Sequence, residues 1–283
     1  MSARFASVSE LVGEFIRDGQ CVALEGFTHL IPFAAGHEII RQRRRDLHLV
    51  RMTPDLVYDQ LIGAGCASAL TFSWGGNPGV GSLHRLRDAV ENEWPRPLKL
   101  HEHSHAGMAA AYCAGASRLP FGLLRGYAGT DLAQANPQIR EVACPYTGEA
   151  IATVPAINPD VTILHAQAAD RDGNVLIRGI LGAQKEAALA AKVLLVTVEE
   201  VIDELAAPMN AVVLPAFAVT AIARVPVGAY PSYAHGHYQR DNSFYLAWDS
   251  ISRDRGAFTA WIQRHVLDTR DHAQFMDSLE QAA

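Results

Sequence analysis

Three short segments of the sequence carry residue types that suit a ligand or a reacting acyl group. The first is Glu25-Gly26-Phe27-Thr28-His29-Leu30-Ile31-Pro32, between a predicted strand and a predicted helix. Gly26 lets the backbone approach a ligand closely, and the helix that follows offers free N–H groups to an anion or a developing oxyanion. A tight turn with no ligand explains the same residues equally well.

The second segment is Ser73-Trp74-Gly75-Gly76-Asn77-Pro78-Gly79-Val80-Gly81-Ser82. Four glycines within seven residues suit close approach to a phosphate or a thioester. The spacing of a dinucleotide-binding motif and the Gly-Lys-Ser/Thr of a phosphate-binding loop are both absent. We expect this segment to form a glycine-rich pocket wall whose ligand the residues alone do not identify.

The third segment is Leu100-His101-Glu102-His103-Ser104-His105, at the end of a predicted strand. Three histidines at a spacing of two share one face of an extended chain, which suggests a metal site. No further ligand can be placed beside them, so we predict no metal. Glu102 and Ser104 share the opposite face. They form either a pocket carboxylate with a neighbouring hydroxyl or a solvated strand end.

The elements that position these segments follow a repeated strand-turn-helix order. We expect strands over 21–24, 47–52, 70–73, 98–103, 161–167 and 193–198. We expect helices over 7–18, where Ser7 and Glu10 form a capping box, and over 33–44, 55–63, 82–93, 106–116, 183–191 and from Glu199 onward. This alternation is typical of an α/β fold with a mostly parallel sheet flanked by helices on both faces. In such sheets ligands bind beyond the carboxyl ends of the strands, where the three segments lie.

Residues 1–283 are expected to form a single domain, because no low-complexity linker or repeat divides the chain. Residues 120–160 loosen into short stretches rich in Gly, Pro, Asn and Thr, which predicts a small flap or subdomain of antiparallel strands. The segment 226–242 is expected to be an ordered surface loop. Residues 243–283 have the apolar spacing of amphipathic helices.

Composition excludes several classes of protein. The net charge of −6 and the interspersed charges argue against nucleic-acid binding, which needs a basic surface. The four cysteines form no Cys-x-x-Cys pair, so neither a zinc knuckle nor a redox motif is predicted. No apolar run reaches the roughly 18 residues of a membrane span, and the N-terminus has no leader pattern. We expect a soluble, cytoplasmic protein with no membrane partner.

Taken together, the motifs resemble the α (A) subunit of the family I coenzyme A transferases, over nearly the whole chain. The resemblance rests on the first segment, on Phe72–Ser82, on Glu102–His105 and on later motifs. The later motifs are Cys144-Pro145-Tyr146-Thr147-Gly148-Glu149, Pro159–Gln167, Asp170–Asn174, Val196–Glu200 and Pro231-Ser232-Tyr233-Ala234-His235-Gly236. Glu25 stands where the general family signature has a glycine.

The resemblance implies a ping-pong reaction in which a glutamate carboxylate of the homologous B subunit forms a glutamyl-CoA thioester. No catalytic residue is then expected in this chain, which contributes half of a shared cleft within an α2β2-type assembly. The substrate-pocket residues implied are Gly26, Phe27, Ser73, Trp74, Gly75, Gly76, Asn77, Glu102, His103 and Ser104. Coenzyme A enters as a thioester substrate, and no cofactor is bound permanently.

The branch of the family most similar to this chain transfers CoA from succinyl-CoA to 3-oxoadipate. A glutaconate-type transferase for another short dicarboxylic or 3-oxo acid remains an alternative, as does a ring-cleaving hydrolase of CoA thioesters. A ligand-sensing domain is the non-enzyme alternative. Arg125 would either pair with the remote carboxylate of a dicarboxylic acid or lie on the surface, and we favour the surface.

Overall fold

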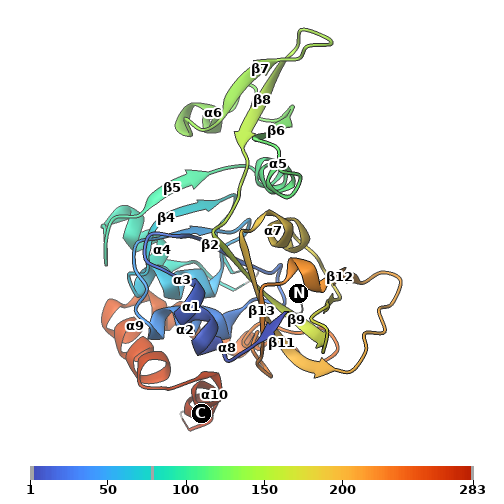
Figure 1. Cartoon of the computed structure of the whole chain (residues 1–283). Helices are drawn as coiled ribbons and strands as arrows, with labels where there is room; N and C mark the ends of the chain where they lie inside the picture. The colour runs from blue at the N-terminus through green and yellow to red at the C-terminus, as the bar shows by residue number, and fades with distance from the viewer. Residues whose placement is uncertain (1–2, 78–79, 282–283) are drawn as a thin grey trace.

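A ten-stranded sheet forms the centre of the computed structural model, which describes residues 3–77 and 80–281 (Figure 1). Eight strands lie in the order β1-β13-β11-β9-β2-β3-β4-β5, and each neighbouring pair along this order is parallel. β10 pairs antiparallel with β9 and with β12. The strands are β1 (Arg4–Phe5), β2 (Cys21–Glu25), β3 (Leu47–Val50), β4 (Ala67–Phe72), β5 (Lys99–Glu102), β9 (Val161–Asp170), β10 (Val175–Ile177), β11 (Val193–Ile202), β12 (Val212–Leu214) and β13 (Ala221–Arg224).

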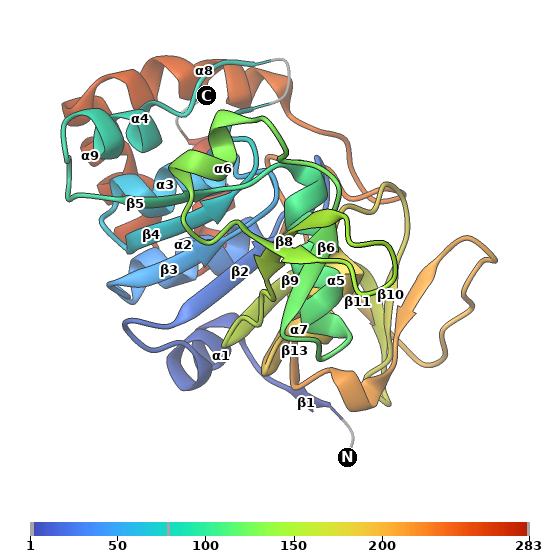
Figure 2. The ribbon, with the colours of Figure 1, turned by 90° about the horizontal axis from the view of Figure 1, so that it is seen from above.

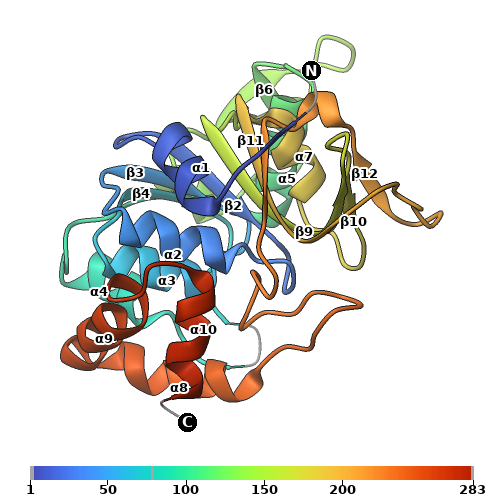
Figure 3. The same cartoon turned by 60° about the horizontal axis from the view of Figure 1, so that its bottom comes forward.

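Helices cover both faces of this sheet. α1 to α4 and the C-terminal helices α8 to α10 lie on one face, and α5 and α7 lie on the other (Figures 1 and 3). The helices are α1 (Val8–Phe15), α2 (Phe33–Arg41), α3 (Leu56–Gly63), α4 (His84–Glu91), α5 (His105–Ala116), α7 (Gln184–Ala190), α8 (Asn242–Arg253), α9 (Arg255–Ile262) and α10 (His272–Glu280). The predicted mostly parallel sheet between two helical layers is therefore confirmed.

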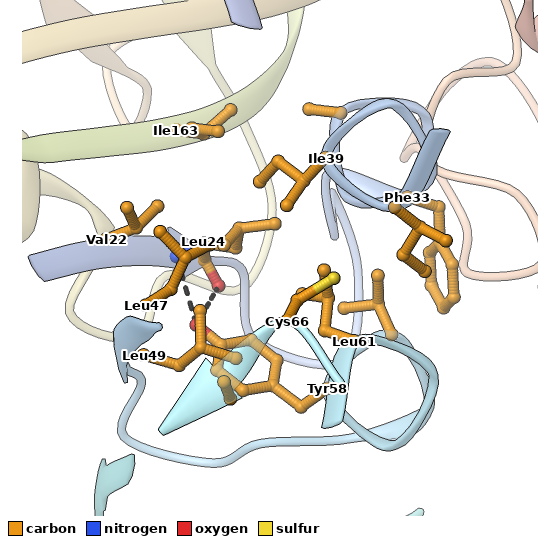
Figure 4. Packing of buried hydrophobic residues seen from close by; sticks show 14 of the residues in the cluster. Val22, Leu24, Phe33, Ile39, Leu47, Leu49, Tyr58, Leu61, Cys66 and Ile163 are labelled. Carbon is orange, nitrogen blue, oxygen red and sulfur yellow. Dashed lines mark hydrogen bonds between the residues drawn. The ribbon is translucent and has the colours of Figure 1, made fainter. Parts of the chain in front are cut away.

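Alternate residues of β2 face opposite layers, as the pleat of a strand requires. Val22 and Leu24 belong to the large apolar cluster with α2 and α3, whereas Ala23 packs with residues of α5 and α7. Figure 4 shows the first of these clusters, in which Tyr58 of α3 lies beside Leu24. The Tyr58 hydroxyl donates to the Val50 carbonyl at 2.7 Å and accepts from the Leu24 amide at 3.0 Å. Tyr58 thus joins α3 to β2 and β3.

A second, three-stranded antiparallel sheet lies over α5, away from the main sheet (Figures 1 and 2). Its order is β6-β8-β7, with β6 (Phe121–Leu124), β7 (Arg140–Ala143) and β8 (Ala150–Pro155), and the short helix α6 (Asp131–Ala135) follows β6. We call residues 121–155 the flap. Residues 203–217 follow β11 and form a smaller projection, which we call the arm (Figure 1). The arm returns to the main sheet through β12, which pairs with β10.

The helix predicted from Glu199 is wrong. β11 continues to Ile202 because Glu200, Val201 and Ile202 pair with residues 168–170 of β9. The pairing partner lies about thirty residues away in sequence, so the local pattern does not show it. The described residues 226–241 contain none of the named helices or strands, and α8 begins at Asn242, the last residue of the predicted loop. Within the described residues, no helix is long and apolar enough to cross a membrane.

Candidate active site

The loops after β2, β3 and β4 meet at the carboxyl edge of the sheet and line a cavity of about 270 Å³. Since β2, β3 and β4 are neighbours, their loops are brought together by the strand order itself. The lining residues are Phe27 and Thr28 after β2, Arg51, Thr53 and Asp55 after β3, Trp74 and Gly76 after β4, and His105 in the first turn of α5.

The loop after β2 is tightly folded at Gly26. A Cβ atom there would lie 2.7 Å from the Leu30 carbonyl oxygen and 2.9 Å from that of His29, so only glycine fits. Two residues that are not glycine, Thr28 and Leu30, have φ angles of 62° and 51° in the left-handed region. For a β-branched residue such as Thr28 this conformation is unusual. The cavity wall is therefore a strained segment.

A buried ion pair forms one side of the cavity. Arg51, only 1% exposed, donates to Asp55 at 2.9 and 3.2 Å and to the Gly26 carbonyl at 2.7 Å. Its guanidinium carbon lies 5.5 Å from the centre of the Tyr58 ring. Burial raises the pKa of Asp55, and the charge of Arg51 opposes this rise. Arg51 ties the loop after β3 to the loop after β2 through the Gly26 carbonyl, and Asp55 holds the Arg51 guanidinium in place.

Glu25 lies beside this cavity but does not line it. Its carboxylate is buried and accepts hydrogen bonds from the Tyr112 hydroxyl at 2.8 Å and from the Met52 amide at 3.1 Å. Burial raises the pKa of Glu25, while the positive charge of Arg51 lowers it. Because Tyr112 belongs to α5, Glu25 joins that helix to the ends of β2 and β3.

The glycine-rich segment places one aromatic ring at the cavity mouth. Trp74 is 45% exposed, and its ring lies over Gly76, where a Cβ would come within 2.7 Å of it. Ser73 donates to the Met52 carbonyl at 2.6 Å and fixes the start of the segment. Gly75 faces Leu86, and Asn77 is buried. Residues 78–79 of the predicted pocket wall lie outside the described residues.

The third predicted segment divides between strand and helix. β5 ends at Glu102, which is exposed, and Ser104 caps α5 by accepting from the Gly107 amide at 3.0 Å. His103 is buried between the flap residues Tyr127 and Asn136, with contacts of 3.4 and 3.2 Å to its two ring nitrogens. The sequence predicts side chains that alternate between the two faces of an extended strand as far as Ser104, but the strand ends at Glu102.

Of the pocket residues implied by the sequence, three line the cavity, and they are Phe27, Trp74 and Gly76. Gly26 and Ser73 lie beside the cavity. Gly26 allows the His29 and Leu30 carbonyls to approach closely, and Ser73 bonds the Met52 carbonyl. Gly75, Asn77, Glu102, His103 and Ser104 do not line it. Five lining residues are not among the implied pocket residues. Thr28 and His105 lie within the first and third candidate segments, whereas Arg51, Thr53 and Asp55 lie outside all three segments. These three residues lie at or just after the end of the predicted strand 47–52, at the same sheet edge, which was a usable signal.

The chemistry of the lining favours an acyl or acid ligand over a metal. Phe27, Thr28, Thr53, Trp74 and His105 surround the space, and the surface that they present to it is mostly apolar. The carboxylate that lines it, Asp55, is held by Arg51. Within the described parts of the chain, no three His, Cys, Asp or Glu side chains are grouped to hold a metal ion. The described lining thus offers walls for a ligand but no unpaired carboxylate.

Comparison with known families decides what kind of protein this cavity belongs to. The family model for coenzyme A transferases matches residues 5–224. The chain belongs to the coenzyme A transferase family.

Named relatives of this coenzyme A transferase chain differ in chemistry. It is 64% identical over 273 residues, 96% of this chain and 97% of the relative, to the A subunit of 3-oxoadipate CoA-transferase from Pseudomonas knackmussii. The solved structure of glutaconate coenzyme A-transferase from Acidaminococcus fermentans superposes with a TM-score of 0.92 at 28% identity, covering 99% and 94% of the two chains. The IpdA subunit of a cholesterol ring-cleaving hydrolase from Rhodococcus jostii is 25% identical, covering 95% of this chain and 93% of that one.

Arg125 lies in the flap, outside the cavity of this transferase chain. Its side chain is 77% exposed and bonds both carboxylate oxygens of Glu149, at 3.0 to 3.3 Å. Arg125 therefore lies on the surface, as expected.

The match to the coenzyme A transferase family favours an enzyme over the alternative of a ligand-sensing domain.

Proposed function

We propose that this chain is the A subunit of a two-subunit transferase that moves CoA from succinyl-CoA to 3-oxoadipate. The observation that carries the proposal is the 64% identity, over 96% of the chain, to the corresponding subunit of a named 3-oxoadipate CoA-transferase. The glutaconate transferase and the ring-cleaving hydrolase, at 28% and 25% identity, are more distant, so they support the family more than the substrate.

The proposed reaction begins with a glutamate of the partner subunit. Its carboxylate attacks the thioester carbonyl of succinyl-CoA, the C–S bond breaks, and an acyl anhydride forms with release of CoA thiolate. The thiolate attacks the glutamyl carbonyl, which releases succinate and leaves a glutamyl-CoA thioester. 3-Oxoadipate then repeats these two steps in reverse order, leaves as its CoA thioester and restores the glutamate. No permanently bound cofactor takes part.

This chain contributes the walls of the acyl pocket in the proposed mechanism. Phe27, Thr28, Trp74 and His105 contact the acyl part of the substrate. Arg51, which is paired with Asp55, joins two pocket loops through its bond to the Gly26 carbonyl. Asp55 is bound by Arg51 and Glu25 is buried against Tyr112 and Met52, so neither carboxylate is free to attack a thioester. This supports a nucleophile supplied by another chain.

Exposed apolar side chains on the two projections support a partner subunit. Monomeric proteins rarely expose large apolar side chains in groups. The flap exposes Phe121, Leu123, Val142 and Tyr146, and the arm exposes Met209, Val213 and Phe217. In the proposed α2β2-type assembly, the homologous B subunit covers part of this surface.

The test is a reconstitution assay with succinyl-CoA and a panel of dicarboxylic and 3-oxo acids. The chain alone is expected to be inactive, and addition of the homologous B subunit should produce transfer with 3-oxoadipate as the preferred acceptor. Preference for glutaconate or another acid would support the glutaconate-type alternative. Hydrolysis of a CoA thioester without any acceptor acid would support the hydrolase alternative and overturn the proposal.

A further inference from the structure

The motif Pro231–Gly236 has no role in the function proposed so far, yet it contacts the strained wall of the cavity. Thr28 and Leu30 both have positive φ angles, a backbone conformation that is unfavourable for residues other than glycine. Strained backbone of this kind persists only where surrounding structure holds it in place. Residues 232 and 233 supply several of the contacts that hold this loop, beside the bond of Arg51 to the Gly26 carbonyl and that of His29 to the Ile180 carbonyl.

Ser232 and Tyr233 contact three successive residues of the strained loop. Ser232 is fully buried, and its hydroxyl donates to the Thr28 carbonyl at 3.1 Å. The Leu30 amide donates to the Tyr233 carbonyl at 2.9 Å. The Tyr233 ring stacks on His29 with 4.9 Å between ring centres, and its hydroxyl lies 3.4 Å from that of Thr28.

The segment that supplies these contacts is itself fixed to the sheet. Glu199 of β11 accepts from the Val227 amide at 2.7 Å and from the Tyr238 hydroxyl at 2.6 Å. Glu199 is also paired with His165 of β9 at 2.6 Å, and His165 is completely buried. The Ala229 amide in turn donates to the Tyr238 hydroxyl at 3.0 Å. Both ends of the segment are thus anchored on β9 and β11, so residues 232 and 233 offer a rigid support.

We propose that Ser232 and Tyr233 are positioning residues of the active site, which hold Phe27 and Thr28 in the conformation that forms the acyl pocket. They do so through the Thr28 carbonyl, the Leu30 amide and the His29 ring. The kinetic part of this proposal, that loss of the contacts lowers turnover, rests on the proposed function. Its structural part, that residues 232 and 233 fix the strained loop, concerns this chain alone.

The experiment combines hydrogen exchange with kinetics in Ser232→Ala. Exchange is measured by mass spectrometry on peptides that cover residues 26–31, and transferase kinetics are measured on the two-subunit enzyme. Ser252→Ala is the matched control, because Ser252 is equally buried but lies in α8 and its hydroxyl has no partner among the described residues. We expect Ser232→Ala to speed exchange in the loop and to lower kcat/KM about 10-fold to 100-fold. Ser252→Ala should change neither.

A Thr28→Gly background separates positioning from a general structural role. Glycine adopts a positive φ without strain, so the support of Ser232 becomes less important. The increase in exchange caused by Ser232→Ala should therefore be at least about twofold smaller in Thr28→Gly than in the wild type. If Ser232→Ala does not assemble, Tyr233→Leu removes the ring stack on His29 and keeps the backbone carbonyl, and the same results are expected.

Unchanged exchange over residues 26–31 in both variants would overturn the structural part of the proposal. Faster exchange with unchanged kinetics would overturn the positioning role. If the wild-type pair shows no CoA transfer with any acid, the proposed function fails, but the exchange data still decide whether residues 232 and 233 hold the loop.

Discussion

Gly26 and Arg51 determine the shape of the cavity at the scale of single residues. Gly26 allows the Leu30 and His29 carbonyls to approach within 2.7 and 2.9 Å of its missing Cβ position. Arg51 joins the Gly26 carbonyl to the carboxylate of Asp55. Gly26 is needed because it has no side chain. Arg51 is needed because its side chain bonds both Asp55 in its own loop and the Gly26 carbonyl in the loop after β2.

Gly26→Ala should damage the site more than the fold. The added methyl pushes two backbone carbonyls aside and displaces the wall that carries Phe27 and Thr28, so kcat/KM is expected to fall at least about 10-fold. Gly13→Ala is the control. Gly13 lies in α1, and a Cβ atom there would lie no closer than 3.5 Å to the nearest atom, in the Gln42 side chain. Because alanine favours a helix over glycine, Gly13→Ala should stabilise the chain by about 0.5–1 kcal/mol and leave the kinetics unchanged. Wild-type kinetics in Gly26→Ala would contradict this account.

The residues that sequence reasoning finds and those it misses differ in how local their signals are. Gly26, Phe27, Trp74 and Gly76 are found because glycines and a strand end are visible in a few adjacent residues. The sequence places Asp55 at the start of a helix, and it does precede α3. Arg51 and Asp55 both line the cavity, but the bond between them forms only when the loop after β3 folds, so the sequence does not reveal it. The burial of His103 depends on flap residues more than twenty positions away, so no local pattern predicts it.

At the scale of elements, periodic apolar spacing predicts most strands and helices but not their ends. A capping box from Ser7 to Glu10 predicts a helix before Gly19, and the two residues form that box in the structure. β11 is longer than expected because β9 supplies a partner for residues 200–202. β5 is shorter because Ser104 accepts from the Gly107 amide in the first turn of α5 and so caps a helix. Strand ends therefore depend on pairing and capping partners.

Ser104 is a cap in the structure, although the resemblance implies a substrate contact. Ser104→Ala removes the bond to the Gly107 amide and should lower the free energy of unfolding by about 1 kcal/mol. Ser104→Asn retains a capping oxygen and should recover most of that loss. Denaturant unfolding of both variants measures the difference. A large rise in KM for the acid in Ser104→Ala without loss of stability would instead favour the substrate contact.

α10 should loosen in acid because two buried histidines lie where it packs on α2. Burial lowers the pKa of His272 to about 4 and that of His37 to about 3, and both rings contact Phe275. The unfolded chain binds these protons near pH 6.5, so stability is complete above that pH and falls as the pH drops toward 4. At pH 5 each histidine should cost roughly 2 kcal/mol.

Hydrogen exchange over residues 272–280 between pH 7 and pH 5, corrected for the intrinsic rate, checks this. His272→Gln cannot acquire the charge and keeps a donor for the Val227 carbonyl, which His272 contacts at 2.9 Å. The variant should lose about half of the acid dependence. An unchanged dependence in the variant would show that other groups control it.

At the scale of the whole molecule, the chain buries both faces of its own sheet, but the proposed active site still needs a glutamate from another subunit. Strand order places the loops of β2, β3 and β4 together, and helices bury both faces of the sheet. The flap and the arm instead project from the sheet and expose apolar side chains (Figure 1). In the proposed assembly these projections meet the B subunit, whose glutamate reaches the cavity from outside this chain.

Covalent trapping of the reaction intermediate tests this central claim most directly. The reconstituted two-subunit enzyme is incubated with succinyl-CoA, the enzyme-CoA thioester is reduced with borohydride, and the modified peptide is identified by mass spectrometry. The account predicts that the reduced residue is a glutamate of the partner subunit, with no modification of this chain. Modification of Glu25 or Glu102 in this chain would contradict it.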